Sequence, residues 1–287
     1  MRGLPRITRL IGLLLLIAVL CGAGIALYFD ERSREETKYV VGSAKAANRI
    51  DLDVTVQTVD ATDGDLVLRV LPKPNGTLAT ATDNPTRNLV IDLTSSTTPE
   101  LRFPAGQPIA VHSVRVDIQN SGIVTDYPFD HYTTVLVFSV TAGGRDVPVR
   151  MSLREVDPFF VTRLRGRSAT PGVVLADIRI SRSRGTFILA WFMMIAMWAL
   201  ALSVLGGAWI LGARRQGVVW PALGWMAATL FALIGMRNAA PGAPPIGSLI
   251  DYASFFWAEA IVAASLTYVA VTGIRAERAA IRSQTRP

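Results

Sequence analysis

The sequence is poor in the residue types that build most recognisable active sites. Its 287 residues include one cysteine, Cys21, and two histidines, His112 and His131. A single cysteine excludes an intramolecular disulfide and a zinc site made of cysteines. The two histidines lie in different strand-like segments, so we interpret them as ordinary strand residues rather than as ligands or bases.

The sequence motifs of catalysis and nucleotide binding are also missing. The glycines are scattered, and there is no G-x-S-x-G elbow, H-E-x-x-H pair or C-x-x-C pair. The aspartates between residues 51 and 65 lack the glycine and the final glutamate of a calcium-binding EF-hand loop. We therefore expect no catalytic residues, no metal site and no cofactor. Carboxylates from separate strands can still meet after folding, which leaves an envelope enzyme as a further alternative.

Apolar residues are abundant and are gathered into long runs. They make up 51% of the chain, while 18% of the residues are charged. This mixture predicts membrane spans joined to a water-soluble domain. Four runs are long enough to cross the ~30 Å hydrocarbon core of a bilayer: residues 10–29, 186–212, 218–236 and 252–274. A signal peptide is the alternative for the first run, but its length favours a retained anchor.

Arginines flank these runs on one side of the predicted membrane. Three precede the first run, two fill the link between the second and third, and four follow the last run. The positive-inside rule makes that side the cytoplasm. We therefore predict a multi-pass protein of the inner (plasma) membrane with both termini in the cytoplasm. The net charge of +7 then reflects membrane orientation and indicates no nucleic-acid partner.

The segment between the first two runs has the period-two pattern of half-buried strands. Eight stretches follow this pattern: residues 50–56, 66–71, 89–93, 109–118, 132–140, 147–153, 160–164 and 173–180. Gly143 and Gly144 are predicted to close a hairpin between the fifth and sixth stretches. So many short strands favour a β-sandwich. The charged residues 30–48 are expected to form a helical or extended stalk.

These observations predict an α+β membrane protein. It consists of an extracytoplasmic β-sandwich and four transmembrane helices, one before the sandwich and three after it. The expected parts are a cytoplasmic N-terminus with the first helix, the sandwich domain, a three-helix transmembrane domain and a basic cytoplasmic tail. Their boundaries are residues 1–29, 30–183, 184–274 and 275–287.

An aromatic turn interrupts the strand pattern at Tyr127, Pro128, Phe129 and Asp130. Proline fixes one backbone angle, and aspartate can cap the turn with its side chain. The peptide resembles the conserved loop of pentameric ligand-gated ion channels, which also join a β-sandwich to a four-helix membrane domain. In those channels all four spans follow the sandwich, whereas here one precedes it. We interpret the turn as a structural corner whose aromatics plug one end of the sandwich.

The most distinctive stretch is rich in proline and lies between the third and fourth runs. It reads MRNAAPGAPPIG over residues 236–247 and continues to Asp251-Tyr252 and to FFWAE over residues 255–259. The chain also has a distinctive order of parts: one span, a strand-rich domain and then three spans. This order and the proline-rich stretch together resemble an uncharacterised membrane-protein family, domain of unknown function four-four-three-six, which is best known from actinobacteria. The resemblance extends over nearly the whole chain. It implies a bacterial inner-membrane location and supplies no activity.

Polar residues flank this proline-rich stretch. Arg237 and Asn238 end the third run where the fourth begins with Asp251. Glu259 lies eight residues further on, about 12 Å deeper along a helix and on nearly the same face. Because an ionised carboxylate facing lipid is costly, we predict a polar cluster of all four residues beneath the loop. A structural lock is the favoured interpretation, and a proton or ion path is the alternative.

The function that best fits these expectations is not enzymatic. We expect a cell-envelope binding or scaffolding module that presents the sandwich outside the cytoplasm. Its partners would be the lipid bilayer and an envelope protein or a small molecule, and a homo-oligomer is possible. The alternative is a channel or transporter subunit, suggested by the several spans, by Glu259 and by the channel-like turn.

Overall fold

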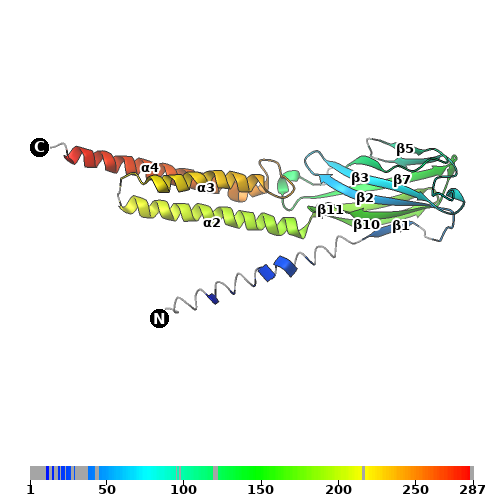
Figure 1. The fold of residues 1–287 in the computed structure, drawn as a ribbon, viewed down its shortest axis with the longest axis horizontal. Helices are drawn as coiled ribbons and strands as arrows, with labels where there is room; N and C mark the ends of the chain where they lie inside the picture. Colours follow the sequence, from blue (N-terminus) through cyan, green and yellow to red (C-terminus); the bar gives the residue numbers. More distant parts are fainter. Residues whose placement is uncertain are drawn as a thin grey trace. The chain divides into compact units, whose positions relative to one another are not determined.

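The computed structural model of the chain describes residues 11–12, 15, 19, 21–22, 24–26, 29, 38–42, 45–94, 96, 98–118, 122–214 and 217–284. These residues fall into two compact units. The strands gather in one unit, within Met1–Ser121 and His131–Gly185 (Figure 1). The helices α2, α3 and α4 form the other, within Gly122–Asp130 and Thr186–Pro287.

The strand-rich unit contains two sheets. The first has the strand order β1-β9-β2-β3-β6. Its strands are β1 (Tyr39–Gly42), β2 (Ile50–Asp60), β3 (Asp65–Pro74), β6 (His112–Asp117) and β9 (Val149–Glu155). Neighbouring strands are antiparallel except β2 and β9, which run parallel.

The second sheet has the order β10-β11-β7-β4-β5, and β8 pairs with β7 at one end. Its strands are β4 (Leu89–Leu93), β5 (Glu100–Phe103), β7 (His131–Ala142), β8 (Arg145–Asp146), β10 (Phe160–Thr170) and β11 (Val173–Arg182). All of these pairs are antiparallel. Two short 3-10 turns, η1 (Gly76–Leu78) and η2 (Val124–Asp126), lie in the connections.

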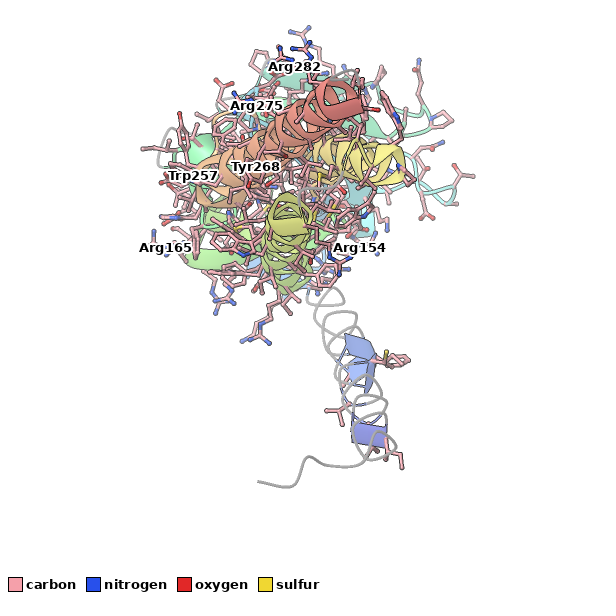
Figure 2. All side chains as sticks on the ribbon, turned by 90° about the vertical axis from the view of Figure 1, so that its left-hand side faces the viewer. Arg154, Arg165, Trp257, Tyr268, Arg275 and Arg282 are labelled. Carbon is pink, nitrogen blue, oxygen red and sulfur yellow. The ribbon has the colours of Figure 1, made fainter. Side chains whose placement is uncertain are left out.

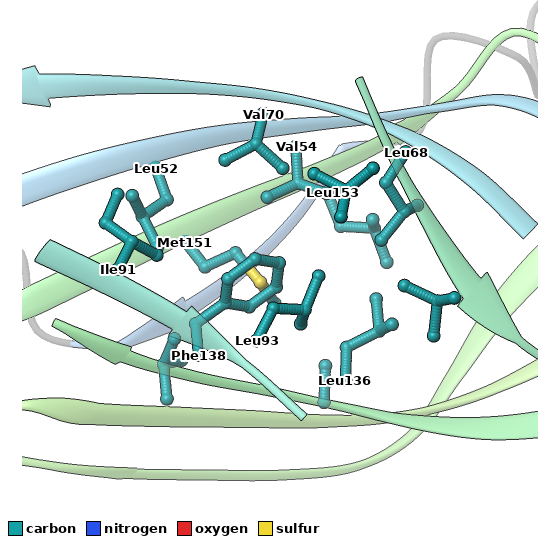
Figure 3. Packing of buried hydrophobic residues seen from close by; sticks show 14 of the residues in the cluster. Leu52, Val54, Leu68, Val70, Ile91, Leu93, Leu136, Phe138, Met151 and Leu153 are labelled. Atoms are coloured by element: carbon teal, nitrogen blue, oxygen red, sulfur yellow. The ribbon is translucent and has the colours of Figure 1, made fainter. Parts of the chain in front are cut away.

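The core of this unit lies between the two sheets. Alternate residues of β2 and β3 are buried and meet alternate residues of β4 and β7, as Figure 3 shows. The residues at the centre are Leu52, Val54, Leu68, Val70, Ile91, Leu93, Leu136 and Phe138. Each is at most 1% exposed, which is the result expected when one face of each strand points inward. The predicted α+β class with a sandwich-like body is therefore confirmed.

The predicted strands match the structure where the alternating pattern is long. All eight stretches contain a strand, and the three strands that were missed, β1, β5 and β8, are the shortest. A strand of two to four residues carries too few alternations to be recognised. β1 lies inside the expected stalk and pairs with β9, so that part of the stalk is a strand of the sandwich. Residues 30–37 of the stalk lie outside the described residues.

The predicted hairpin is correct at its turn and wrong in its partner. Gly143 and Gly144 both have positive φ angles, as a two-residue hairpin turn requires. The returning strand is β8, which has only two residues. The chain cannot continue along β7 beyond this point, because β11 occupies the same edge of β7 from Ser139 onward. The chain then crosses to the other sheet, where β9 pairs with β1 and β2.

The helical unit contains α2 (Arg184–Arg214), α3 (Trp220–Asn238), the π-turn η3 (Asp251–Phe255) and α4 (Phe256–Gln284). Two segments of the described chain, Arg184–Arg214 and Asp251–Arg282, are long and apolar enough to cross a membrane. The four spans that we expected are therefore not all found. α3 is a helix of 19 residues, but its tryptophans and its polar end at Arg237 and Asn238 lower its hydropathy. The first expected span lies largely outside the described residues.

The three helices share an apolar core. Its buried residues come from α2, α3 and α4, and α3 and α4 pack directly against each other. They are Met197, Ala201, Val204, Ala208, Met226, Leu233, Ala258, Val262 and Val269. Close approach is supported by small residues at the crossings. A Cβ at Gly273 would lie 3.1 Å from the Cα of Val218, for example.

Candidate functional site

A cleft of about 150 Å³ opens in the strand-rich unit. It is lined by the end of β9, the start of β10, the end of β11 and Tyr39 of β1. The pairing register places Phe160 of β10 opposite Arg182 of β11. The guanidinium carbon of Arg182 lies 4.2 Å from the centroid of the Phe160 ring, a cation–π contact that covers one wall of the cleft.

The polar centre of the cleft is Glu155, the last residue of β9. Both of its carboxylate oxygens are buried, and no hydrogen bond of ordinary geometry reaches them from the described residues. The pKa of Glu155 is raised to about 7, mainly by burial and also by the nearby charge of Asp157, although the hydroxyl and backbone of Thr162 act in the opposite direction. The carboxyl group is therefore about half ionised at neutral pH.

Thr162 and Asp157 have different roles around this carboxyl group. The hydroxyl of Thr162 is buried and close enough to the Glu155 carboxyl group to lower its pKa, but it makes no hydrogen bond of ordinary geometry within the described residues. Asp157, in contrast, accepts hydrogen bonds of 2.8 Å from the backbone N–H groups of Val59 and Phe159. Asp157 therefore holds the turn between β9 and β10, while Glu155 and Thr162 have oxygens available to a ligand.

Arginines surround the cleft. Arg154, Arg163 and Arg184 line it at the surface, and Arg182 is 9% exposed. Guanidinium groups bind carboxylates and phosphates through paired hydrogen bonds. The arginines that line the cleft give it a positive field that favours a ligand with negative charge.

None of the cleft residues was singled out from the sequence, although a signal was present. The alternation of β9, β10 and β11 assigns one polar residue of each strand to the face that points toward the core: Glu155, Thr162 and Arg182. The residue two positions before each of them is buried. Charged and polar side chains at core-facing positions are uncommon and point to a special environment. Polar residues at the strand positions that alternate with the outward-facing ones would therefore have indicated this site.

The predicted aromatic corner has a different surrounding from the one we expected. Tyr127 is completely buried, and its neighbours are the apolar residues Ala190, Met193, Met194, Ala240 and Ile250 of the helical unit. Its aromatic ring therefore packs in the apolar interior of the helical unit. The whole connection from Gly122 to Asp130 belongs to the helical unit, although it joins β6 to β7.

The remaining residues of this corner follow the same pattern. The bond between Tyr127 and Pro128 is a cis peptide. The ring of Phe129 meets the ring of Phe187 edge to face, with 5.3 Å between centroids. Asp130 is 2% exposed. The corner is thus part of the loop that connects β6 to β7, and its side chains pack among the helices.

The structure brings together two of the four residues of the predicted polar cluster. Nε of Arg237 donates to one carboxylate oxygen of Asp251, and Nη2 donates to the other, both at 2.8 Å. The same guanidinium donates to the carbonyl oxygens of Pro244 at 3.1 Å and Pro245 at 2.8 Å. Arg237 therefore ties the end of α3 to both the proline-rich loop and the start of the next helix.

Asp251 completes this arrangement from the other side. Its carboxylate also accepts backbone N–H bonds from Gly247 at 2.8 Å and from Ser248 at 3.2 Å. Neither partner of the ion pair is more than 9% exposed at its side chain. A buried pair with its hydrogen bonds satisfied fixes geometry, and it has no remaining group for chemistry.

The other two predicted members lie apart from this pair. Asn238 is exposed, and Glu259 is partly exposed about 12 Å further along the helix. No hydrogen bond connects either residue to Arg237 or Asp251 within the described residues. The guanidinium group of Arg237 is already occupied by Asp251 and the two proline carbonyls, so it does not extend toward Glu259. One oxygen of Glu259 is buried without a partner.

Comparison with known proteins assigns families but no activity. Residues 182–276 match the family model Domain of unknown function (DUF8686), and this match contains the proline-rich stretch on which the sequence resemblance rested. A search of curated proteins finds no match. No group of three potential metal ligands is brought together in the described part of the chain. Residues 40–180, which contain nearly all the strands of the sandwich, match Domain of unknown function (DUF4436), the family that the sequence resemblance predicted.

Proposed function

We propose that this protein is a binding module of the cell envelope, anchored by transmembrane helices and presenting its sandwich outside the cytoplasm. The cleft around Glu155 is its binding site, and the ligand is a small molecule, or a group on a larger partner, that carries negative charge. The observation that carries the proposal is the burial of the Glu155 and Thr162 oxygens, which no hydrogen bond of ordinary geometry reaches in the described chain.

The energetic argument is that such oxygens are costly unless something binds them. A buried polar atom without a hydrogen bond costs roughly 1–3 kcal/mol, and nearly all buried polar atoms in proteins have a partner. Asp157, two residues from Glu155, follows this rule fully. A ligand that donates to Glu155 and binds the surrounding arginines would recover the cost.

The membrane part of the proposal has four spans, with both termini in the cytoplasm. It is supported by two apolar helices of sufficient length, Arg184–Arg214 and Asp251–Arg282. It is also supported by the arginines that follow along the end of α4, of which Arg275 and Arg282 are labelled in Figure 2. These arginines lie on the predicted cytoplasmic side.

Reporter fusions test this topology. A fusion after Gly144 should be active only with an extracytoplasmic reporter, and a fusion after Arg275 only with a cytoplasmic one. A cytoplasmic signal from the fusion after Gly144 would overturn the proposed location of the sandwich.

Ligand binding is tested with the full chain in mild detergent. A panel of small phosphates, sulfates and carboxylates is screened for compounds that raise the unfolding temperature. We expect the shift to disappear in Glu155→Gln and Thr162→Val, each compared with its own unliganded state. Thr170→Val is the matched control, because Thr170 is exposed on the same strand and does not line the cleft. A shift that persists in both cleft variants would place the ligand elsewhere.

A channel or transporter subunit is the second candidate. The observation in its favour is Glu259, which carries a buried oxygen without a described partner in an apolar helix. Intramembrane carboxylates often mark ion or proton pathways. This candidate requires a ring of subunits in detergent and a solute flux in liposomes that Glu259→Gln abolishes. A monomer without flux would remove it.

A further inference from the structure

The groups of the cleft restrict the chemistry of its ligand. Glu155 favours a hydrogen-bond donor, whereas the guanidinium groups of Arg154 and Arg163 favour an anion. The arginines would repel a simple cation, and the charge of Glu155 would weaken the binding of a simple anion. A ligand that carries a donor beside its negative group satisfies both requirements.

The size of the cleft restricts the ligand further. A volume of about 150 Å³ corresponds to roughly five water molecules of ~30 Å³ each. This accommodates a phosphate together with a short amine or hydroxyl arm. Tyr39 and Phe160 supply aromatic surface at its wall, and the hydroxyl of Thr162 can donate or accept beside Glu155.

The position of the cleft along the chain indicates where such a ligand comes from. Arg184 lines the cleft and is also the first residue of α2, one of the two segments long and apolar enough to cross a membrane. The apolar residue Phe187 follows at roughly 5 Å along the helix axis. Only about one helical turn of chain therefore separates this lining residue from the apolar part of α2, a length typical of the headgroup layer of a bilayer.

We propose that the cleft binds a phospholipid headgroup that carries an amine or a hydroxyl beside its phosphate, in the leaflet where α2 begins. The phosphate contacts the arginines, and the amine or hydroxyl donates to Glu155. This inference rests on the proposed function and names the ligand of the same site. The same chemistry occurs in soluble phosphate esters, so the experiment must separate the two sources.

The experiment uses the purified full chain in mild detergent and measures lipid binding by native mass spectrometry. The lipids are phosphatidylethanolamine and phosphatidylglycerol, which carry a donor, and phosphatidylcholine, whose trimethylammonium group carries none. We expect one or both of the first two to bind at least about tenfold more tightly than phosphatidylcholine, because one hydrogen bond to a charged group is lost. Equal binding of all three lipids would overturn the inference.

Variants connect the preference to the cleft. Glu155→Gln should remove the preference for donor-bearing lipids, whereas Arg163→Gln should weaken the binding of all three. Arg165→Gln is the matched control: Arg165 is exposed on the same strand, does not line the cleft, and lies well apart from Arg154 in Figure 2. A lipid preference that survives Glu155→Gln, in a variant whose circular dichroism is unchanged, would also overturn the inference.

Soluble probes distinguish this inference from the proposed function. Phosphoethanolamine, glycerol phosphate and inorganic phosphate are tested by calorimetry on the same preparation. If the soluble esters bind at the cleft and the lipids do not, the lipid inference is wrong while the binding function stands. If neither the lipids nor the soluble probes bind, both fail.

Discussion

Replacing Glu155 with glutamine should make the strand-rich unit less sensitive to pH. Glutamine has nearly the shape of glutamate and stays neutral, so it copies the protonated carboxyl group that burial favours. Because both carboxylate oxygens are buried, the change removes a charge that the folded state must otherwise accommodate above neutral pH.

The sign and size follow from the pKa of Glu155, which rises from an ordinary value of 4.5 to about 7 in the folded protein. Below 4.5 the carboxyl is protonated in both states, and its contribution to stability is fully present. Between 4.5 and 7 the unfolded state loses its proton first, so stability falls by up to about 1.4 kcal/mol per pH unit. Above 7 the contribution is lost. Glu155→Gln should therefore match the parent at pH 4 and exceed it by up to about 3 kcal/mol at pH 8.

Hydrogen exchange of β9, β10 and β11 in the full chain is a suitable assay. All six tryptophans lie after residue 190, so their fluorescence does not report on the strands. Comparing parent and variant at the same pH cancels the effect of pH on intrinsic exchange. A difference of about 3 kcal/mol corresponds to roughly a hundredfold change in protection, provided that exchange occurs through unfolding of the unit.

The control for this experiment is Glu100→Gln. Glu100 is paired with Arg102 at the surface, and this pairing lowers its pKa. Its replacement should give no gain at pH 8, and any effect should be a small loss above pH 4, where the pair is ionised. Equal protection of the parent and Glu155→Gln at pH 8 would refute the reasoning, because the carboxyl would then not be destabilising when ionised.

Two further predictions concern the helical unit. Asp251→Asn should lower its stability by about 3–5 kcal/mol, because it leaves the buried Arg237 without its counter-ion; thermal unfolding followed by tryptophan fluorescence measures this, and Asn238→Ala, an exposed neighbour, should change nothing. Gly273→Val should cost roughly 1–3 kcal/mol, because a Cβ there would lie 3.1 Å from the Cα of Val218, a backbone atom that cannot turn aside. Gly206→Val is its control, since that position is open. Equal unfolding temperatures within either pair would contradict the packing argument.

The long strands could be predicted because their pattern is set by the core. Ile50, Leu52, Val54 and Val56 alternate with polar residues, and each is at most 1% exposed. Alternation encodes which face is buried, so it identifies strands without knowledge of their partners. It carries little information about pairing, and for this reason the parallel contact between β2 and β9 was not anticipated.

The candidate sites differ in how much of them the sequence could reveal. Arg237 and Asp251 are 14 residues apart, on either side of one short loop, so proximity along the chain was enough to bring them together. The aromatic corner is different: Tyr127 meets residues of α2 that lie more than 60 positions away. Its burial among helices depends on the tertiary fold, and no local pattern specifies it.

The cleft depends on a single departure from the expected topology. If β9 had paired with β7 through the predicted hairpin, Glu155 would have extended within the same sheet as β10 and β11. β11 prevents this, because it already pairs with that edge of β7 from Ser139 onward. The carbonyl of Pro148 accepts a 2.9 Å hydrogen bond from Ile50 of the other sheet. Glu155 therefore approaches Thr162 and Arg182 from the opposite layer of the sandwich. Turn chemistry predicted the Gly143–Gly144 turn correctly, but the pairing of β11 with β7, which no local pattern specifies, determined which strands surround the site.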